Sequence, residues 1–466
     1  MAEPRDVDVV VVGLGPGGEA VATRLAGAGL SVVGVDRRLV GGECPYYGCI
    51  PSKMMIRAAH VLAEGRRVPG LAGSSTVTPD WTPVHARIRD EATDDWNDEA
   101  AVKRLEDAGV TFARGPARLT GPRTVEVDPP TGSGQRGTTF TARRGVVLNP
   151  GTEPSAPPID GLAGTPFWTN REACRLAELP ESLAIIGGGP IGAELAQVYA
   201  RFGVRVTVLE AGARILGPLE PEASAVVAEA FADDGIEVLT GVRIASVGYD
   251  GQRFAVQLAG RAVEAERLLV AAGRRPNLPD LGLDTVGLDP SARSVDVNER
   301  MRATGADGDG LWAIGDVTGK GAYTHMSMYQ AGIAVRDILG QDGPPARYHA
   351  VPHVTFTDPE VGAVGMTERQ ARDAGLSVRV GSTDLASSTR GWIHGASGLV
   401  KLVEDADRGV LVGATSVGPT GGEVLSMLVT AVHAEVPTDT LRTMIYAYPT
   451  FHRAVEAALD DLGASA

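Results

Sequence analysis

The segment Asp8–Asp36 reads DVVVVGLGPGGEAVATRLAGAGLSVVGVD and determines the predicted fold of the first part of the chain. Its four valines predict a buried parallel strand, which runs into Gly13, Gly15 and Gly18 and then into a helical pattern. A second apolar stretch ends at Asp36. This order of strand, GxGxxG turn, helix, strand and acid is the dinucleotide-binding fingerprint. The glycines let the backbone approach a pyrophosphate at the helix N-terminus, and the acid accepts from a ribose hydroxyl.

The same pattern occurs a second time. The repeat lies 174 residues after the first segment and contains the residues Gly187, Gly189, Gly192 and Glu210. An internal repeat of that fidelity predicts two dinucleotide-binding domains in one chain. Both copies also reach a later strand that ends at a glycine shortly before a proline, at Gly151 in the first copy and at Gly273 in the second.

The first copy leads into the segment GGECPYYGCIPSK at residues 41–53, which contains two of the chain's three cysteines, Cys44 and Cys49. Since residues five apart on a regular helix point about 140° away from each other, a disulfide requires a turn, and Gly48 gives the chain freedom to make it. A cysteine at the start of the helix predicted at residues 50–62 meets the positive end of the helix dipole, which lowers the thiol pKa. The segment therefore indicates a redox-active pair, and the alternative is two buried, inert cysteines. A zinc site is not predicted, because no further Cys or Cys/His pair completes four ligands.

A third cofactor signal follows the second copy. The apolar run GLWAIGD at residues 310–316 predicts a short strand ending at Gly315 and Asp316, where the acid can bind a ribityl or ribose hydroxyl. The linker at residues 340–345 is rich in Gly and Pro and indicates a domain boundary. Helical patterns are predicted at residues 81–108, 324–339, 422–435 and 451–462. Alternating apolar residues predict antiparallel strands at residues 351–356, 399–403 and 410–416. The last part of the chain is therefore expected to form a separate α+β domain.

The composition is that of an ordinary globular protein, with 43% hydrophobic and 22% charged residues in 466. A net charge of −15 argues against nucleic acid as a partner. No stretch approaches the roughly 20 apolar residues of a membrane span, and the valine run near the N-terminus is too short for a signal peptide. We therefore expect a soluble, cytoplasmic protein without a membrane partner. A disulfide in that compartment serves catalysis more often than structure.

These motifs resemble those of the flavin-dependent pyridine nucleotide–disulfide oxidoreductases, the family of dihydrolipoamide dehydrogenase, glutathione reductase and mercuric reductase. The cysteine segment is similar to the family's GG-x-C-x4-GC-x-P-[ST]-K segment. The two glycine turns match in family order, as do AAGRRPN at residues 271–277, WAIGD at residues 312–316 and VPHVTFTDPEVGAVG at residues 351–365. The resemblance covers nearly the whole chain.

The resemblance implies an α/β fold with two Rossmann-like dinucleotide-binding domains and a C-terminal α+β dimerisation domain. FAD is expected on the first glycine copy and NADH, or NADPH, on the second. The expected domains are an FAD-binding domain at residues 1–150 and 277–345, an NAD(P)H-binding domain at residues 151–276 and an interface domain at residues 346–466. The protein is expected to be a homodimer with active sites shared between subunits.

The resemblance also implies roles for single residues. Cys49 corresponds to the thiol nearest the flavin and Cys44 to the exchanging thiol. Lys53 and Glu194 correspond to the pair beside the flavin, where a lysine stabilises negative charge on the reduced ring and a glutamate keeps the lysine charged. The expected cofactor-binding residues are Gly13, Gly15, Gly18, Asp36, Gly42, Lys53, Gly151, Gly187, Gly189, Gly192, Glu210, Gly273, Gly315 and Asp316.

The residues near Glu210 bear on the choice of nicotinamide nucleotide. An acid at this position accepts from a ribose 2′-hydroxyl and repels a 2′-phosphate, which favours NADH. Arg205 and Arg214 lie close enough in sequence to leave NADPH open. Cys174, the third cysteine, lies in a polar segment and is expected to have no redox role.

The chain departs from the family near its C-terminus. Disulfide-reducing members carry a His-Pro-Thr motif whose histidine is the acid–base group for thiol exchange, with a glutamate shortly after it. In this chain Tyr448 takes the histidine's position and Arg453 the glutamate's. With a pKa of about 10, tyrosine is a poor base for a dithiol at neutral pH. His452 and Glu456, four residues apart as on one helix face, are candidates to replace the lost pair.

The leading hypothesis is an FAD-dependent NAD(P)H oxidoreductase that passes electrons through the Cys44–Cys49 disulfide to an acceptor needing little proton transfer. Such an acceptor is a metal ion, a quinone or a small disulfide. Dihydrolipoamide oxidation is the first alternative. The second is direct flavin chemistry, as in a transhydrogenase or diaphorase with non-essential cysteines. The third is a non-catalytic redox sensor or a subunit of a larger complex.

Overall fold

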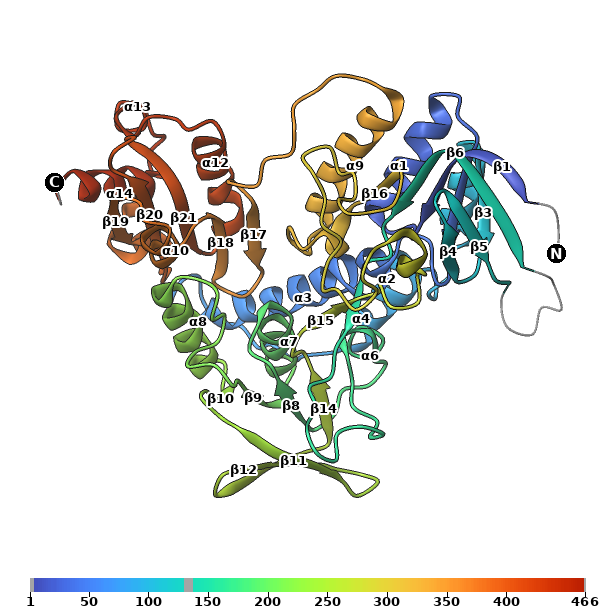
Figure 1. The fold of residues 1–466 in the computed structure, drawn as a ribbon. Coiled ribbons are helices and arrows are strands. Elements are labelled where there is room, and N and C mark those ends of the chain that lie inside the picture. Colours follow the sequence, from blue (N-terminus) through green and yellow to red (C-terminus); the bar gives the residue numbers. More distant parts are fainter. Residues whose placement is uncertain (1–3, 130–136, 465–466) are drawn as a thin grey trace. The chain divides into compact units, whose positions relative to one another are not determined.

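The computed structural model describes residues 4–129 and 137–464 and divides the chain into two compact units, whose elements are labelled in Figure 1. Unit 1 comprises Met1–Pro51, Ala86–Ser155 and Arg274–Arg347. Unit 2 comprises Ser52–His85, Ala156–Gly273 and Tyr348–Ala466. The helix α3 (Cys49–Arg67) begins in unit 1 and continues into unit 2.

Unit 1 is built on one large sheet with the strand order β3-β2-β1-β6-β5-β4, and β16 pairs with β6. The strands are β1 (Arg5–Val12), β2 (Val32–Asp36), β3 (Val110–Arg114), β4 (Ala117–Gly121), β5 (Thr124–Val127), β6 (Thr138–Leu148) and β16 (Leu311–Ala313). The pairs among β3, β2, β1, β6 and β16 are parallel, whereas β4 and β5 extend the sheet as an antiparallel hairpin. The four consecutive valines of β1, residues 9–12, are buried, as expected for a parallel strand covered on both faces.

The helices of unit 1 cover this sheet and connect its strands. They are α1 (Pro16–Gly27), α2 (Glu43–Tyr47), the π-helix η1 (Arg87–Ala92), α5 (Glu99–Asp107), the 3-10 helices η2 (Leu283–Val286) and η3 (Gly315–Thr318), and α9 (Thr324–Leu339). Helix α1 packs on α9. A Cβ atom on Gly17 would lie 2.0 Å from Ser327 Oγ, so this packing requires a glycine. A short antiparallel ribbon is formed by β7 (Thr152–Pro154) and β15 (Arg274–Pro276).

The first part of unit 2 has a parallel sheet of order β10-β9-β8-β14. Its strands are β8 (Ser182–Ile186), β9 (Arg205–Leu209), β10 (Glu237–Leu239) and β14 (Arg267–Val270). An antiparallel sheet follows, with β11 (Ile244–Tyr249), β12 (Phe254–Leu258) and β13 (Arg261–Ala265). The helices here are α4 (Thr82–Ala86), α6 (Asn170–Ala173), α7 (Pro190–Arg201) and α8 (Pro221–Asp233). Both sheets contribute to one hydrophobic core.

The C-terminal part of unit 2 has an antiparallel sheet of order β17-β18-β21-β20-β19. The strands are β17 (Pro352–Thr355), β18 (Glu360–Gly365), β19 (Val378–Asp384), β20 (Leu399–Asp405) and β21 (Val410–Gly418). The helices are α10 (Glu368–Asp373), η4 (Leu385–Ser387), α11 (Thr389–His394), α12 (Gly421–His433), α13 (Thr438–Arg442) and α14 (Arg453–Ala464). Helices α12 and α14 pack against this sheet and share its hydrophobic core.

The predicted α/β fold class, with two Rossmann-like sheets and a separate C-terminal α+β part, is confirmed. The helical stretch predicted at residues 81–108 is formed by α4, η1 and α5, with a break between η1 and α5. Asp94, Asp95 and Trp96 have positive φ values of 48°, 53° and 57°. The indole N–H of Trp96 donates to the Tyr46 carbonyl at 3.0 Å, so a contact distant in sequence holds this break in place.

Strands β18 and β19 were not predicted from the sequence. The four central residues of β18 are all buried, so the strand lacks the alternation of apolar and polar residues that marks a half-buried strand. Strand β19 contains Gly381, whose Cβ would lie 2.1 Å from the Ala458 carbonyl oxygen of α14. In the part of the chain that the structure describes, no helix is long and apolar enough to cross a membrane.

A buried lysine links the two parts of unit 2. The side chain of Lys401, on β20, is only 5% exposed, and its ammonium group contacts three carboxylates. The Nζ–Oε distances are 3.0 Å to Glu220, 2.9 Å to Glu222 and 3.0 Å to Glu368. Because Glu220 is itself buried, its charge depends on this partner.

We expect Lys401→Met to lower the free energy of unfolding by about 3–5 kcal/mol, since the substitution leaves a buried carboxylate unpaired. Calorimetric unfolding of the purified protein measures the change. Lys103→Met is the matched control, because Lys103 forms an exposed ion pair with Asp107 and its loss is expected to leave the unfolding temperature unchanged. Equal shifts for the two variants would contradict the stabilising role of Lys401.

Candidate active site

The first glycine turn is held by close approaches of one backbone segment to another. Gly13 has a φ of +92°, and a Cβ on it would lie 2.2 Å from the Asn149 carbonyl oxygen. A Cβ on Gly18 would lie 2.0 Å from the Gly13 carbonyl oxygen. At Gly15, the N-cap of α1, the nearest atom is 3.5 Å away. Two glycines are therefore required by the turn itself, whereas Gly15 leaves open space at the helix N-terminus.

The second glycine turn repeats this geometry. Gly187 has a φ of +109°, and its Cβ would lie 2.5 Å from the Ala271 carbonyl oxygen. A Cβ on Gly192 would lie 2.0 Å from the Gly187 carbonyl oxygen, and one on Gly189 would meet no atom within 4 Å. The division into two packing glycines and one glycine facing open space is thus the same in both copies.

The two acids that end β2 and β9 also make matching contacts. The Asp36 carboxylate accepts from the backbone N–H groups of Leu14 at 2.8 Å and Arg38 at 2.7 Å. Burial raises the pKa of Asp36, and these hydrogen bonds oppose that rise. The Glu210 carboxylate accepts from the N–H groups of Gly188 at 2.7 Å and Gly212 at 2.6 Å. Each acid therefore holds its own turn, and its remaining lone pairs can still accept from a ribose hydroxyl.

The cysteine segment turns at Gly48, between α2 and α3. Cys44 lies in α2 and is half-buried, and Cys49 is the first residue of α3 and is exposed. Both are thiols rather than a disulfide. Hydrogen bonding with Cys49, together with burial, raises the pKa of the Cys44 thiol far above its ordinary value. The lowered thiol pKa was expected for the cysteine at the start of the helix, which is Cys49, and stays a prediction.

Thr324 completes this thiol cluster. Its Oγ1 lies 3.5 Å from Cys49 Sγ, and it also hydrogen-bonds the Cys44 thiol, which lowers that thiol's pKa without cancelling the rise. Thr324 is the first residue of α9 and lies 275 residues after Cys49 in the chain. The sequence predicted the start of this helix but not that its first side chain faces the cysteines.

A chain of polar contacts connects the cysteine segment to the third cofactor signal. Glu43, next to Cys44, forms an ion pair with Arg274 at 3.3 Å. Arg274 Nε donates to Thr152 Oγ1 at 2.8 Å, and Thr152 Oγ1 donates to Asp316 Oδ2 at 2.6 Å. The sequence indicated Asp316 but not Arg274 or Thr152, whose role depends on the pairing of β7 with β15.

Other predicted cofactor-binding glycines of unit 1 are next in sequence to residues of this series of polar contacts. The Gly315 N–H donates to Gln330 Oε1 at 2.7 Å, which fixes the end of β16. Gly151 has a φ of +67° and no atom within 4 Å of its Cβ position. Gly42 has a φ of +69°, and its Cβ would lie 3.0 Å from the Gly15 Cα atom. The cysteine segment is thereby packed against the first glycine turn.

In unit 2, the predicted lysine and glutamate form an ion pair. Lys53 Nζ lies 2.8 Å from Glu194 Oε2, and the Lys53 side chain is 36% exposed, against 7% for Glu194. The other oxygen, Glu194 Oε1, accepts from the Phe356 N–H at 2.9 Å, and the ammonium group lies 4.6 Å from the Phe356 ring centroid. Phe356 therefore contacts both members of the pair. Lys53 follows Cys49 by four residues in α3.

Gly273, the last predicted glycine of the second copy, has a φ of +127° and no atom within 4 Å of its Cβ position. Arg214 donates to the backbone carbonyls of Gly217 at 2.7 Å and Leu219 at 3.1 Å. Both bonds are made by its Nη2 atom. Cys174 is buried at the end of α6.

Near the C-terminus, the structure differs from the prediction that His452 and Glu456 share one helix face. The Tyr448 side chain is 64% exposed, its hydroxyl donates to Thr389 Oγ1 at 3.3 Å, and Arg453 lies over its ring. His452 lies just before α14, so it does not share a helix face with Glu456 as predicted. Glu456 instead forms an ion pair with Arg453 at 3.2 Å.

Within residues 4–129 and 137–464, no group of three or more His, Cys, Asp or Glu side chains is arranged to hold a metal ion.

The two glycine turns, their acids and the intervening thiol pair occur in the order and spacing of one known family. Residues 7–335 match the model of the pyridine nucleotide-disulphide oxidoreductases. The chain belongs to this family. Residues 351–459 match the family's dimerisation domain, which supports a homodimer for this oxidoreductase. Members of the family are enzymes that use FAD and NAD(P)H.

Relatives of this oxidoreductase with different substrates are similar to it along nearly its whole length. The dihydrolipoyl dehydrogenase of Thermus scotoductus is 32% identical, over 98% of each chain. The mercuric reductase of Bacillus cereus is 29% identical, over 97% of this chain and 71% of that protein. Among solved structures, a Cu(II) complex of the HOCl-induced flavoprotein disulfide reductase RclA from Escherichia coli has a TM-score of 0.85 at 25% identity. It covers 98% of this chain and 99% of its own.

The residues present in this oxidoreductase fit both cofactors of the family. Gly15 and Gly42 leave the N-terminus of α1 without side chains, and Gly189 does the same at the N-terminus of α7. Both helices are 12 residues long, so their N-terminal N–H groups and dipoles favour a pyrophosphate. A Cβ at any of these glycines would occupy the space that a phosphate group needs.

The two kinds of glycine in the second turn give a paired prediction. We expect Gly189→Ala to leave the unfolding temperature unchanged, because no atom lies within 4 Å of the added Cβ, but to weaken NADH binding. The expected loss is at least about 10-fold in Kd, or ~1.4 kcal/mol. Gly192→Ala is expected to lower both stability and affinity, because its Cβ would lie 2.0 Å from a carbonyl oxygen. Calorimetry and NADH titration measure the two quantities, and unchanged affinity in Gly189→Ala would contradict a nucleotide at this turn.

Proposed function

We propose that this oxidoreductase uses NADH to reduce a thiophilic metal ion such as Cu(II) or Hg(II), with Cys44 and Cys49 as the electron relay. The observation that carries the proposal is the thiol pair itself, with Cys49 exposed and Cys44 hydrogen-bonded behind it. Thiolates are the preferred protein ligands of soft metal ions. A quinone or a small disulfide is the alternative acceptor.

FAD, when bound, supplies the redox chemistry that takes a hydride from reduced nicotinamide and delivers an electron pair to a disulfide. The Lys53 ammonium group places a positive charge beside the site where we propose the flavin lies. Glu194, which is only 7% exposed, keeps that ammonium group oriented and is itself held by the Phe356 N–H. These two residues therefore supply charge and orientation rather than a transferred proton.

The proposed thiol cycle balances without an outside base. Two electrons and two protons convert the Cys44–Cys49 disulfide into two thiols. Two Cu(II) ions then take one electron each, the S–S bond re-forms, and the two protons leave to water. The reaction of a single Hg(II) ion consumes the same two electrons.

The Tyr448 position supports an acceptor of this kind. A thiol–disulfide exchange partner needs a proton on its leaving sulfur, which the family histidine provides, whereas a metal ion needs none. The Tyr448 hydroxyl is a hydrogen-bond donor with a high ordinary pKa and is a poor base. Mercuric reductases at 29% identity and the Cu(II) complex of RclA show that proteins similar to this chain are associated with soft metal ions.

NADH is part of the proposal. The Glu210 carboxylate lies at the position that receives a ribose hydroxyl and would repel a 2′-phosphate. Arg205 and Arg214 left NADPH open, and of these two Arg214 donates to two backbone carbonyls. We also propose the domain division and the site-residue roles that the sequence analysis gave. The proposed location is the cytoplasm, because reduced nicotinamide and a reducing thiol pool coexist there.

Dihydrolipoamide oxidation is a second candidate function, because the Thermus scotoductus dihydrolipoyl dehydrogenase is 32% identical over 98% of each chain. The two candidates differ in their need for an acid–base group at position 448.

For the relay, we expect Cys44→Ser and Cys49→Ser each to lower NADH-dependent Cu(II) reduction at least about 100-fold, or ~2.7 kcal/mol in transition-state free energy. A Cu(I) chelator that absorbs visible light measures the rate. In the parent protein, anaerobic NADH is also expected to create two alkylatable thiols in mass spectra. Cys174→Ala is the matched control, since this cysteine is buried and has no part in the proposed relay. Full activity of the Cys44→Ser, Cys49→Ser double variant would show that the flavin reduces the acceptor without the cysteines.

For the acceptor, we expect Tyr448→His with Arg453→Glu to raise dihydrolipoamide turnover by at least about 10-fold, because the pair restores a general base and its partner. Cu(II) reduction is expected to stay within about twofold, since that step needs no base. Steady-state rates with each substrate measure both. Efficient dihydrolipoamide turnover by the parent protein, with no gain in the variant, would favour the dihydrolipoyl dehydrogenase assignment instead.

A further inference from the structure

Helix α7 carries an unusual row of buried polar side chains. Glu194, Gln197 and Arg201 are spaced three and four residues apart, so they share one helix face, and their exposed fractions are 6%, 3% and 3%. A buried helix face is normally apolar. The row therefore needs polar partners, and all three side chains find them in the loop at residues 356–358, between β17 and β18.

Each member of the row binds a different part of that loop. The Phe356 N–H donates to Glu194 Oε1 at 2.9 Å. The Asp358 N–H donates to Gln197 Oε1 at 2.7 Å, and Gln197 Nε2 donates back to the Asp358 carbonyl at 2.9 Å. Arg201 Nη2 donates to the Asp358 carboxylate at 2.9 Å. The loop is thus bound to α7 at its backbone and its side chain.

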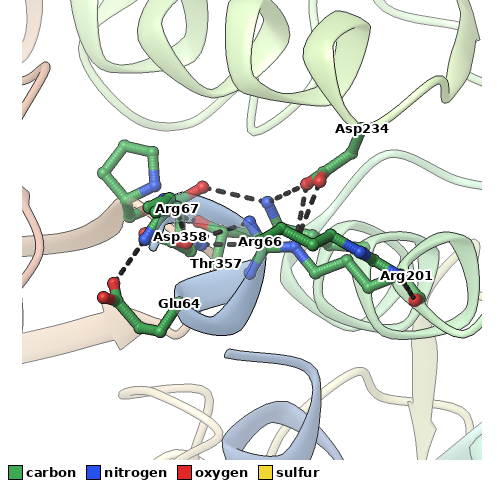
Figure 2. A network of polar contacts seen from close by, with 9 residues as sticks. Glu64, Arg66, Arg67, Arg201, Asp234, Thr357 and Asp358 are labelled. Carbon is green, nitrogen blue, oxygen red and sulfur yellow. Dashed lines mark hydrogen bonds and ion pairs between the residues drawn. The ribbon is translucent and has the colours of Figure 1, made fainter. Parts of the chain in front are cut away.

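Further charges hold the Asp358 end of this loop, as Figure 2 shows. Arg67, from α3, contacts the Asp358 carboxylate at 2.5 Å, and Arg201 also contacts Asp234 at 3.0 Å. Arg66 donates to the Arg201 carbonyl at 2.7 Å. Burial would raise the pKa of Asp358, but the charges of Arg201 and Arg67 outweigh it and lower that pKa.

The other end of the loop contacts the ion pair described above. Phe356 fixes one oxygen of Glu194, and its ring faces the Lys53 ammonium group. Lys53 and Arg67 are both on α3, so this helix is bound to the loop at two places. A shift of the loop would move the Phe356 N–H and ring, and the Lys53–Glu194 pair would lose two of its contacts.

We propose that Gln197, Arg201 and Asp358 are positioning residues, which hold the loop at residues 356–358 so that Phe356 orients the Lys53–Glu194 pair. The inference rests on the proposed function only in assigning that pair to the flavin. None of the three residues exchanges protons or electrons. Their effect on hydride transfer passes through Glu194 and Lys53.

The test compares Thr438→Val with Gln197→Met, which keeps side-chain length and removes both hydrogen bonds to Asp358 as well as the one that Gln197 donates to Asp234 at 2.8 Å. Thr438 is equally buried, at 3% exposed, and bonds Glu404 and the Gly409 carbonyl, so it is a matched loss of a buried polar group. Asp358→Asn is the second variant, which keeps the loop's volume in case Gln197→Met folds poorly. Calorimetry shows which variants fold.

The first readout needs no bound cofactor. The rate at which an acylating reagent modifies the Lys53 amine is followed by mass spectrometry. We expect Gln197→Met and Asp358→Asn to raise that rate about 2- to 5-fold, as loss of a partly exposed ion pair would. Thr438→Val is expected to leave it unchanged. An unchanged rate in both loop variants, with a raised rate in Glu194→Gln, would overturn the positioning role.

The second readout is the rate constant of flavin reduction by NADH in rapid mixing. We expect a decrease of about 10- to 100-fold in the loop variants with unchanged NADH affinity, because misplacement by an ångström can cost that much. In the double variant of Gln197→Met with Glu194→Gln, the decrease should be no larger than in Glu194→Gln alone. Additive decreases would overturn the inference. An unchanged rate of flavin reduction in Glu194→Gln itself would instead contradict the proposed function. The acylation rate of Lys53 would then decide whether the loop positions the ion pair.

Discussion

Both parallel sheets depend on one steric constraint, the contact of a glycine turn with the backbone at the end of a neighbouring strand. Gly13 approaches the Asn149 carbonyl and Gly187 the Ala271 carbonyl so closely that a Cβ would overlap either oxygen. A positive φ at both glycines makes any other residue strained as well. The same approach that closes each turn points the N-terminus of α1 or α7 into open space, where a pyrophosphate can bind.

Two of the buried or half-buried carboxylates, Glu194 and Asp358, are each shared by several partners. Glu194 is bound by an ammonium group and a backbone N–H, and Asp358 by two guanidinium groups and Gln197. An unpaired carboxylate at such depth would cost several kcal/mol, so each network acts as a unit. Because α7 contributes side chains to both networks, the polar row on this helix links the conformation of the loop at residues 356–358 to the orientation of Lys53.

The thiol cluster and the ion pair perform different tasks. The Cys44 thiol is hydrogen-bonded to Cys49, whereas Lys53 and Glu194 form an ion pair. A relay to a soft acceptor needs the first, and an anionic reduced ring benefits from the second. The replacement of the family's histidine by Tyr448 changes only proton supply, which is consistent with an acceptor that takes electrons alone.

The sequence by itself determined both glycine turns, their acids and the thiol segment, because each is a run of neighbouring residues whose spacing expresses local backbone geometry. It indicated Lys53 and Glu194 only through resemblance to a family. The tertiary structure alone decided that Thr324 faces the cysteines across 275 residues and that Gln197 binds Asp358 across 161. It also corrected His452, which lies outside α14. A buried polar group bonds to the partner that tertiary packing places within reach, and the spacing of neighbouring residues in the sequence does not predict that partner.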